Sequence, residues 1–244
     1  MRKALTRGAY TLRTGYWHNG ERCCPDFPDE NFFNHFKVYR FASQFCLGRK
    51  ILDVGCGTGY GTSHLAESAK MAVGIDLSRQ AVRYARKRYR NPNLEFLRMS
   101  AESLEFTERS FDFVLSTENF EHLHDHRANL RQIGSLLTDD GMLLLATPNP
   151  EMFVGISNRY HTHEFAYDEL VQILQESFAE CLVCENQLVP PTEEGRRMQE
   201  ERQKRGAVGI NLSIDPWMWG ERTDTTYLLN THSFFCFARK PRRR

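Results

Sequence analysis

The stretch Ile51-Leu-Asp-Val-Gly-Cys-Gly-Thr-Gly59 decides the fold, and Val73-Gly-Ile-Asp-Leu77 follows it after a short segment. The first stretch reads as a buried apolar strand that runs into a turn with enough glycine for a ligand to approach the backbone closely. The second reads as an apolar strand that ends in the carboxylate of Asp76. In doubly wound α/β proteins an acid at that position binds ribose hydroxyls. The two stretches together predict an α/β fold that binds a nucleoside.

The glycine spacing indicates which nucleoside is bound. The turn reads Gly55-x-Gly57-x-Gly59, and Tyr60 stands where a dinucleotide fingerprint has its third glycine. Asp53, inside the strand, suits a cationic ligand and would repel a pyrophosphate. The pattern resembles motif I of the class I S-adenosylmethionine-dependent methyltransferases. S-adenosylmethionine carries a sulfonium and an ammonium and no phosphate, so the charge argument agrees with the resemblance.

Strand and helix patterns alternate along the chain, which favours a parallel sheet with helices on both faces. A helix over residues 29–47 precedes the first strand. The strands are expected at 50–55, 71–76, 93–97, 111–116, 142–146, 179–187 and 233–238. The remaining helices are expected at 60–69, 78–89, 127–137 and 167–178, and a turn is expected at 138–141. The resemblance implies a doubly wound, seven-stranded, mostly parallel sheet whose last strand is antiparallel.

The chain of 244 residues suggests one elaborated domain. We expect an N-terminal arm and helix at 1–47, a methyltransferase domain at 48–239 with an insertion at 190–230, and a basic tail at 240–244. No stretch reaches the roughly 18 apolar residues of a membrane span, and no secretory signal is evident. The net charge of +1 gives no global attraction to nucleic acid. These features predict a cytoplasmic protein without membrane partners, and they disfavour a nucleic-acid partner.

The resemblance also implies the residues that hold the cofactor. Asp76 would bind the ribose, Leu77 would lie against adenine, and Tyr39 and Arg40 would lie near the cofactor carboxylate. The full expected set is Tyr39, Arg40, Asp53, Gly55, Cys56, Gly57, Asp76, Leu77, Ala101, Glu102, Ser116 and Thr117.

A second motif, Glu118-Asn-Phe-Glu121-His122, stands at the end of the predicted fourth strand. Its Glu-x-x-Glu-His spacing resembles two metal-using branches, the ubiquinone-pathway O-methyltransferases and the small-RNA 3′-end 2′-O-methyltransferases. The latter branch carries a distal histidine, which here corresponds to His163. The resemblance therefore implies a Mg²⁺, Mn²⁺ or Zn²⁺ site whose ligands are Glu118, Glu121, His122 and His163.

A mixed oxygen and nitrogen ligand set is suited to such cations. A bound cation lowers the pKa of a coordinated hydroxyl and so makes an alcohol a better nucleophile. His161 is a candidate base, and the expected catalytic set is His122, His161 and His163.

The leading hypothesis is O-methylation of a hydroxylated small molecule, such as a sugar, a glycan or a catechol-like ring. Two alternatives stay open: 2′-O-methylation of an RNA 3′ end, and a non-catalytic S-adenosylmethionine-binding protein. A nicotinamide dehydrogenase is disfavoured by the missing third glycine. The acceptor atom and the oligomeric state stay open.

Overall fold

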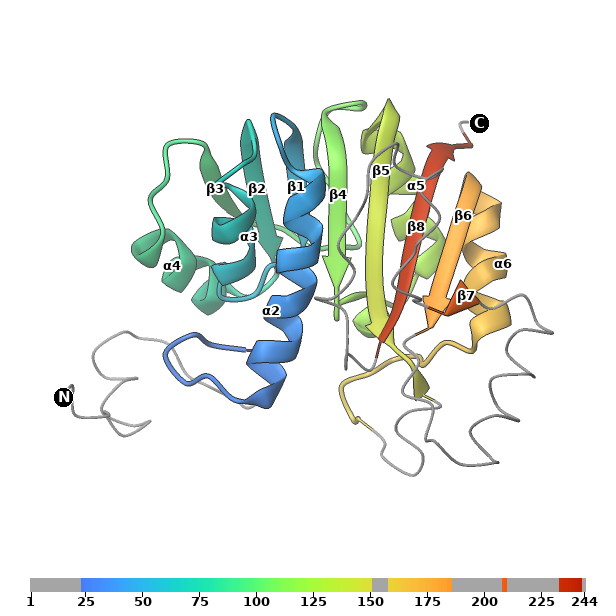
Figure 1. The fold of residues 1–244 in the computed structure, drawn as a ribbon, viewed down its shortest axis with the longest axis horizontal. Coiled ribbons are helices and arrows are strands. Elements are labelled where there is room, and N and C mark those ends of the chain that lie inside the picture. The colour runs from blue at the N-terminus through green and yellow to red at the C-terminus, as the bar shows by residue number, and fades with distance from the viewer. Residues whose placement is uncertain (1–22, 151–157, 186–207, 210–232, 243–244) are drawn as a thin grey trace.

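The computed structural model describes residues 23–150, 158–185, 208–209 and 233–242. The strands in these residues form one sheet in the order β3-β2-β1-β4-β5-β8-β6-β7 (Figure 1). The strands are β1 (Lys50–Val54), β2 (Met71–Asp76), β3 (Leu94–Arg98), β4 (Phe111–Thr117), β5 (Leu137–Pro148), β6 (Phe178–Glu185), β7 (Val208–Gly209) and β8 (Ser233–Pro241).

The sheet confirms the predicted topology. Strand β1 pairs in parallel with β2 and β4, and β3 and β5 extend the parallel part outward. The last strand, β8, is antiparallel to both of its neighbours, β5 and β6. Seven strands were predicted, and the two-residue β7 lengthens the sheet by a short eighth strand beside β6.

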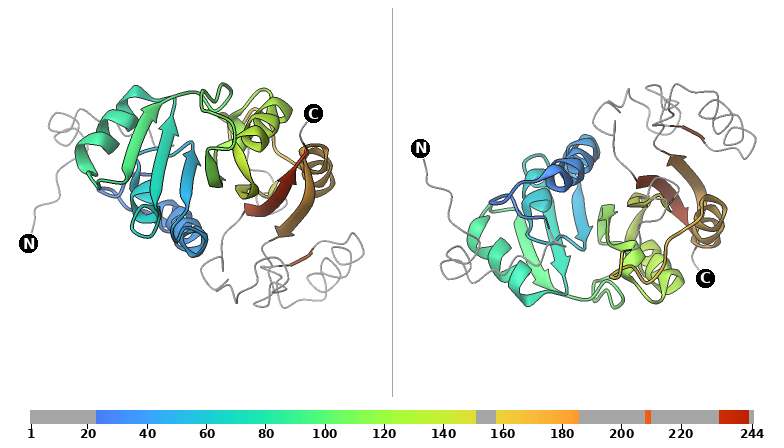
Figure 2. Two further views of the ribbon diagram at one scale, coloured as in Figure 1. Left: turned by 90° about the horizontal axis from the view of Figure 1, so that it is seen from above. Right: turned by 90° about the horizontal axis from the view of Figure 1, so that it is seen from below.

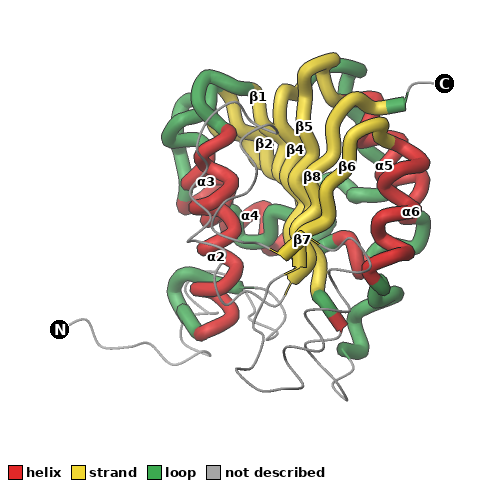
Figure 3. The backbone as a smooth tube through the Cα atoms, turned by 45° about the vertical axis from the view of Figure 1, so that its right-hand side comes forward, coloured by secondary structure: helices red, strands yellow, loops and turns green. Residues whose placement is uncertain are grey.

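Helices cover both faces of the sheet (Figures 2 and 3). The α-helices are α2 (Glu30–Ala42), α3 (Tyr60–Leu65), α4 (Arg79–Arg88), α5 (His126–Leu136) and α6 (Tyr167–Ser177). Two short 3₁₀ turns, η1 (Ser43–Phe45) and η2 (Phe120–His122), complete the described helical segments. Helices α5 and α6 bury their apolar residues in one core cluster, and α2 and α3 bury theirs in a second cluster on the opposite face.

Side-chain caps fix where several helices begin. Asp29 accepts from the backbone N–H of Phe32 at 2.8 Å at the start of α2, and Asp125 accepts from that of Ala128 at 2.8 Å at the start of α5. Ser78 caps α4, as the sequence predicts. Such caps satisfy N–H groups that have no partner within the helix.

The segment 138–141 differs from the prediction. It was expected as a turn before the fifth strand, but β5 runs from Leu137 to Pro148 and includes it. Phe111 pairs with Leu137 and Phe113 already pairs with Met142, so the four intervening residues leave the ladder as a bulge. A bulge adds residues to one strand without ending it, which explains why a turn-like sequence lies inside a strand.

Parts of the predicted domain organisation lie outside the described residues. These parts are residues 1–22 of the arm and helix at 1–47, nearly all of the insertion at 190–230, and the end of the basic tail. Lys240 and Pro241, which were assigned to the tail, belong to β8, and Lys240 pairs with Glu180. None of the helices in the described part of the chain has both the length and the apolar character that a bilayer crossing requires.

Candidate functional site

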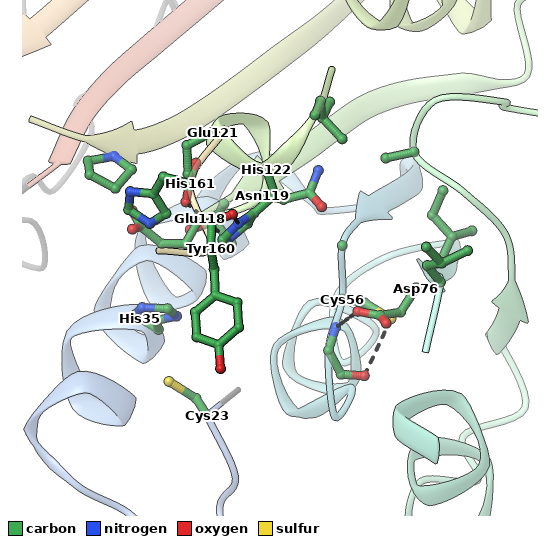
Figure 4. A pocket seen from close by; sticks show the side chains of 18 of the residues that line it. Cys23, His35, Cys56, Asp76, Glu118, Asn119, Glu121, His122, Tyr160 and His161 are labelled. Atoms are coloured by element: carbon green, nitrogen blue, oxygen red, sulfur yellow. Dashed lines mark hydrogen bonds and ion pairs between the residues drawn. The ribbon is translucent and has the colours of Figure 1, made fainter. Parts of the chain in front are cut away.

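A cavity of about 690 Å³ opens at the carboxyl edge of the parallel strands, within the range of small-molecule sites. Its lining comes from the turn after β1, the tip of β2, the loop after β3, the segment after β4, helix α2 and the loop at 158–164. Figure 4 shows Asp76 and Cys56 on one side of this cavity, and Glu118, Glu121, His122 and His161 on the other. Ligands of open α/β sheets bind at this edge.

Asp76 is held in position by the glycine turn. Its Oδ2 accepts from the backbone N–H of Gly57 at 3.0 Å, and its Oδ1 accepts from that of Ser78 at 2.7 Å. Each carboxylate oxygen can accept more than one hydrogen bond. The oriented carboxylate lines the cavity and can therefore also accept from the hydroxyls of a ribose.

The glycine turn leaves backbone open to the cavity. Gly55 has φ +80°, and a Cβ there would lie 2.5 Å from the side chain of Asn119. Gly57 has φ +53°, and a Cβ there would meet nothing within 4 Å. The turn thus has the form of a cradle that a ligand can fill, which fits the methionyl end of S-adenosylmethionine.

Asp53 lies behind the wall of the cavity and does not belong to its lining. It is fully buried, and it accepts from Thr62 Oγ1 at 2.6 Å and from the Tyr39 hydroxyl at 3.4 Å. Burial raises the pKa of Asp53 to about 7, against the two hydrogen bonds, which lower it. Tyr39 itself faces the cavity. Asp53 therefore orients the cavity wall through Tyr39 and Thr62.

Most of the other expected cofactor residues line the cavity: Gly55, Cys56, Gly57, Leu77, Ala101, Glu102 and Thr117. Ser116 and Arg40 do not. Ser116 is fully buried, because its side chain projects from the opposite face of β4 to that of Thr117. Arg40 is exposed on the last turn of α2, and it follows Tyr39, whose side chain takes the inward direction. Arg40, which was expected near the cofactor carboxylate, is therefore not among the residues that line the cavity.

Glu102 is engaged with the segment that follows η2. Its Oε1 accepts from the backbone N–H of His124 at 2.7 Å and lies 3.3 Å from Nδ1 of the same residue. The hydrogen bond from the His124 backbone is the main reason why the pKa of Glu102 is lowered. Glu102 thus ties the predicted adenine loop to the motif of the fourth strand.

Glu121, His122 and His161 form a group whose potential ligand atoms all lie within 4.8 Å of one another. Glu121 is buried, and its Oε2 accepts from Thr147 Oγ1 at 2.9 Å. His122 Nδ1 lies 2.9 Å from the carbonyl oxygen of Tyr160, and its Nε2 lies 3.7 Å from Glu121 Oε1.

The second histidine of this group is oriented by a carboxylate. His161 Nδ1 lies 3.2 Å from Glu164 Oε1, and its Nε2 lies 3.0 Å from Asn158 Nδ2. Metal-binding histidines usually have one ring nitrogen fixed by a carbonyl or a carboxylate, as Nδ1 of His122 is by Tyr160 and Nδ1 of His161 is by Glu164. The mixed donor set and these contacts fit a divalent cation.

The described residues bring together a different group from the predicted ligand set. His163 lies outside the group, because its Nε2 pairs with Glu169 Oε2 at 2.9 Å and its ring packs on Phe165. His161 lies inside the group. Glu118 lines the cavity, but it too lies outside the three-residue group, and its Oε1 accepts from Ser233 Oγ at 2.7 Å.

Several lining residues were not predicted as site residues. His35 comes from α2 and Tyr160 from the loop at 158–164, and Figure 4 shows both directed into the cavity. Asn119 packs against Gly55 and also lines it. Asn119 lies inside the Glu118–His122 motif quoted above, and Tyr160 directly precedes His161, so their positions were a usable signal. Nothing distinguishes His35 from the other polar residues of its helix.

Comparisons with known proteins agree with this geometry. A methyltransferase-domain family model matches residues 52–145. A probable S-adenosylmethionine-dependent methyltransferase of Mycobacterium tuberculosis is 32% identical over 172 residues, which cover 68% of this chain and 62% of that protein. Phthiotriol/phenolphthiotriol dimycocerosates methyltransferase of the same species is 37% identical over 127 residues, which cover 50% of this chain and 47% of that protein.

Solved structures share the fold at low identity. An S-adenosylmethionine-dependent methyltransferase from Mesorhizobium loti has a TM-score of 0.57 at 16% identity. The match covers 86% of this chain and 98% of that chain. A chain from the Haloferax volcanii complex of a methyltransferase with its Trm112 activator has a TM-score of 0.60 at 17% identity. The match covers 86% of this chain and 91% of that chain.

Doubly wound α/β proteins bind nucleosides with a glycine turn and a strand-tip carboxylate at the carboxyl edge of the sheet, and this cavity has both features. The domain match and the relatives make the chain similar to S-adenosylmethionine-dependent methyltransferases, and the solved structures show that it has the class I methyltransferase fold. The chain spans only 62% of the length of the Mycobacterium tuberculosis relative that it matches over 172 residues.

Proposed function

We propose that the protein transfers the methyl group of S-adenosylmethionine to a hydroxyl oxygen of a small molecule with the help of a divalent cation. One observation supports this above all. The glycine turn with Asp76 and the group of Glu121, His122 and His161 open into the same cavity. A site for a methyl donor and a site that can activate a hydroxyl are therefore adjacent.

The cofactor, when bound, supplies an electrophilic methyl group on a sulfonium. The backbone of Gly55 to Gly57 would hold its methionyl end, and Asp76 would accept from its ribose hydroxyls. Leu77 and Ala101 line the same end of the cavity and would enclose the adenine. Holding donor and acceptor in a defined orientation is itself a large part of the acceleration in a displacement reaction.

A divalent cation would be held by Glu121, His122 and His161, and when bound it would lower the pKa of an acceptor hydroxyl. Mg²⁺, Mn²⁺ and Zn²⁺ are all compatible with one carboxylate and two imidazoles. The buried carboxylate of Glu121 is fixed by Thr147, and His161 is oriented by Glu164. Three histidines were predicted to be catalytic. We assign two of them, His122 and His161, to holding the cation. His163 would support the loop through Glu169.

A hydroxylated sugar, glycan or catechol-like ring remains our proposed acceptor. The name of one relative gives phthiotriol and phenolphthiotriol dimycocerosates as its acceptors, and these are hydroxyl compounds by name. The intact constellation of Asp76 and the acid–histidine group argues against a purely regulatory binding protein.

The proposal is tested by methyl transfer from labelled S-adenosylmethionine to a panel of hydroxylated metabolites, in added Mg²⁺ or Mn²⁺ and in excess chelator. We expect label in an alkali-stable ether product, and a loss of at least tenfold in rate on chelation. Unchanged turnover in chelator would remove the cation from the mechanism, and label only on nitrogen or carbon would exclude O-methylation.

The ligand set is tested by comparing His161→Ala with His163→Ala. We expect the first substitution to weaken Mn²⁺ binding at least tenfold in isothermal titration, since it removes one of three ligands. The second should leave Mn²⁺ affinity within about twofold, because His163 pairs with Glu169. The opposite ranking would show that His163 is the ligand and that the assignment of His161 is wrong.

A further inference from the structure

Helix α4 presents a row of basic side chains to solvent. Arg79, Arg83, Arg86 and Lys87 lie within an arc of about 100° around the helix, because each residue turns the helix by about 100°. All four side chains are exposed. The opposite side of the helix is buried and consists of Ala81, Val82, Tyr84 and Ala85. The four basic residues, which we call the basic face of α4, therefore point away from the sheet.

The positive charge of this face is not neutralised within the described part of the chain. From Leu77 to Leu94 the sequence has basic residues and no acidic residue. Asp26 pairs at 3.2 Å with Arg88, which lies on another side of the helix. Arg86 Nε donates to the backbone carbonyl of Phe96 at 2.7 Å, and a carbonyl leaves the charge in place. Because the whole chain has a net charge of only +1, the positive charge is concentrated on α4.

The basic face lies on the outer flank of the molecule. Helix α4 packs against β2 and β3, and β3 is the edge strand of the sheet (Figure 1). None of the four basic residues lines the cavity of the candidate site or the shallower cavity beside Lys50 and Lys70. The aromatic residue of α4, Tyr84, is buried. The face thus offers positive charge without a groove and without an aromatic platform.

These properties distinguish between the possible anionic partners. Single-stranded nucleic acid is typically bound in a basic groove that also supplies aromatic side chains for base stacking. A protein that takes up an amphipathic helix needs its apolar side, and that side of α4 is buried. Clusters of four to eight lysines and arginines on an amphipathic helix are typical of binding to anionic lipid headgroups. A layer of such headgroups requires only an accessible positive face.

We infer that the basic face of α4 docks the protein on a membrane surface that contains anionic phospholipids. The sequence-based expectation of no membrane partner rested on the lack of an apolar span, and electrostatic attachment to headgroups needs no such span. The inference is independent of the proposed function, because none of the four residues lines the cavity.

The test is co-sedimentation of the protein with lipid vesicles. Vesicles of phosphatidylcholine alone are compared with vesicles that contain about 30% phosphatidylglycerol, at about 50 mM and about 500 mM NaCl. We expect at least tenfold tighter binding to the anionic vesicles at the lower salt concentration. Most of this binding should be lost at the higher concentration, because salt screens exposed charges. A short RNA and a short DNA duplex, measured in the same buffers, should bind more weakly than the anionic vesicles.

Matched charge reversals test whether α4 is the docking face. Arg83 lies in the middle of α4, and the control residue Arg131 is equally exposed in the middle of α5. Arg83→Glu and Arg131→Glu change the net charge by the same amount. We expect the first to weaken binding to anionic vesicles at least fivefold and the second less than twofold. Arg83→Gln should give an intermediate loss, and all three variants should keep the wild-type melting temperature within a few degrees.

Three results would overturn the inference. They are no preference for anionic vesicles at low salt, equal losses of binding in Arg83→Glu and Arg131→Glu, and tighter binding to RNA or DNA than to anionic vesicles. The last result would assign the basic face to nucleic acid. Each of them would leave the methyltransferase proposal standing, because that proposal is tested by methyl transfer and not by vesicle binding.

Discussion

Asp53 is a buried acid whose ionisation opposes folding. It has no exposed surface, and its described partners are the hydroxyls of Thr62 and Tyr39. Two neutral donors only partly replace water around a carboxylate, which is why its pKa rises to about 7. The sequence motif predicted an acid that meets the cofactor region. The direction of its side chain, behind Tyr39, depends on packing that the motif does not contain.

This pKa has a consequence for stability. In the unfolded chain Asp53 titrates near 3.9, so between about pH 4 and pH 7 the folded protein holds a proton that the unfolded chain has lost. The contribution of Asp53 to stability therefore falls as pH rises through that window and is level above it. The Asp53→Asn variant does not show this pH dependence, because asparagine has no carboxyl group to titrate.

We expect the unfolding free energy of wild type minus that of Asp53→Asn to fall by about 2–3 kcal/mol between pH 5 and pH 8. Urea denaturation of both proteins at a series of pH values measures this difference, and groups that titrate in both proteins cancel. A difference that is constant with pH would show that Asp53 is ionised throughout the range.

At the scale of elements, the turn between β1 and α3 depends on backbone that only glycine adopts easily. Gly55 combines a positive φ with the close approach of Asn119, which also lines the cavity. The turn and the segment after β4 are thus packed together, and this contact joins the cofactor side of the cavity to the acid–histidine side.

Gly55→Ala should cost about 2–4 kcal/mol of stability, because it adds left-handed backbone strain and a clash with Asn119. Gly48→Ala is the control, since Gly48 has φ +69° but open space around its Cβ position, and it should cost only about 1 kcal/mol. Chemical denaturation compares the two. Equal losses would mean that Asn119 moves aside at no cost.

The sequence predicts elements well where apolar runs end in strong signals. β1 and β2 end at glycine or a carboxylate, and Ser78 begins α4, so these elements were placed within one or two residues. The segment 138–141 was misread because Asp, Asp and Gly are typical of turns, whereas the strand pairing of Leu137 is a long-range property.

The sequence likewise predicted some residues of the candidate site and not others. Asp76 and Glu121 follow directly from motif spacing, and both line the cavity. His161 and His163 have similar local sequence. Their different roles depend on Glu164 and on Glu169, the latter from the first turn of α6, which no spacing rule specifies.

For the whole molecule, function depends on the topology that brings distant segments to one edge. β1, β2, β4 and β5 are parallel, so their carboxyl ends place the glycine turn, Asp76, Thr117 and Pro148 around one cavity. The chain order of strands and helices makes this convergence predictable.

A ligand that binds only the folded state stabilises it, by about 2.7 kcal/mol when its concentration is one hundred times its dissociation constant. Such a gain raises the melting temperature of a protein of this size by several degrees. We therefore expect S-adenosylhomocysteine to raise the melting temperature of the protein in differential scanning fluorimetry and NAD to leave it unchanged. Stabilisation by NAD alone would indicate a dinucleotide site.

The most direct measurement of the central claim is isothermal titration of S-adenosylhomocysteine into wild type, Asp76→Asn and the exposed control Asp140→Asn. Wild type and the control should bind one equivalent with equal affinity, and Asp76→Asn should bind at least tenfold more weakly while it keeps a cooperative melting transition. No binding to wild type, or equal binding to all three proteins, would contradict a cofactor site built on the glycine turn and Asp76.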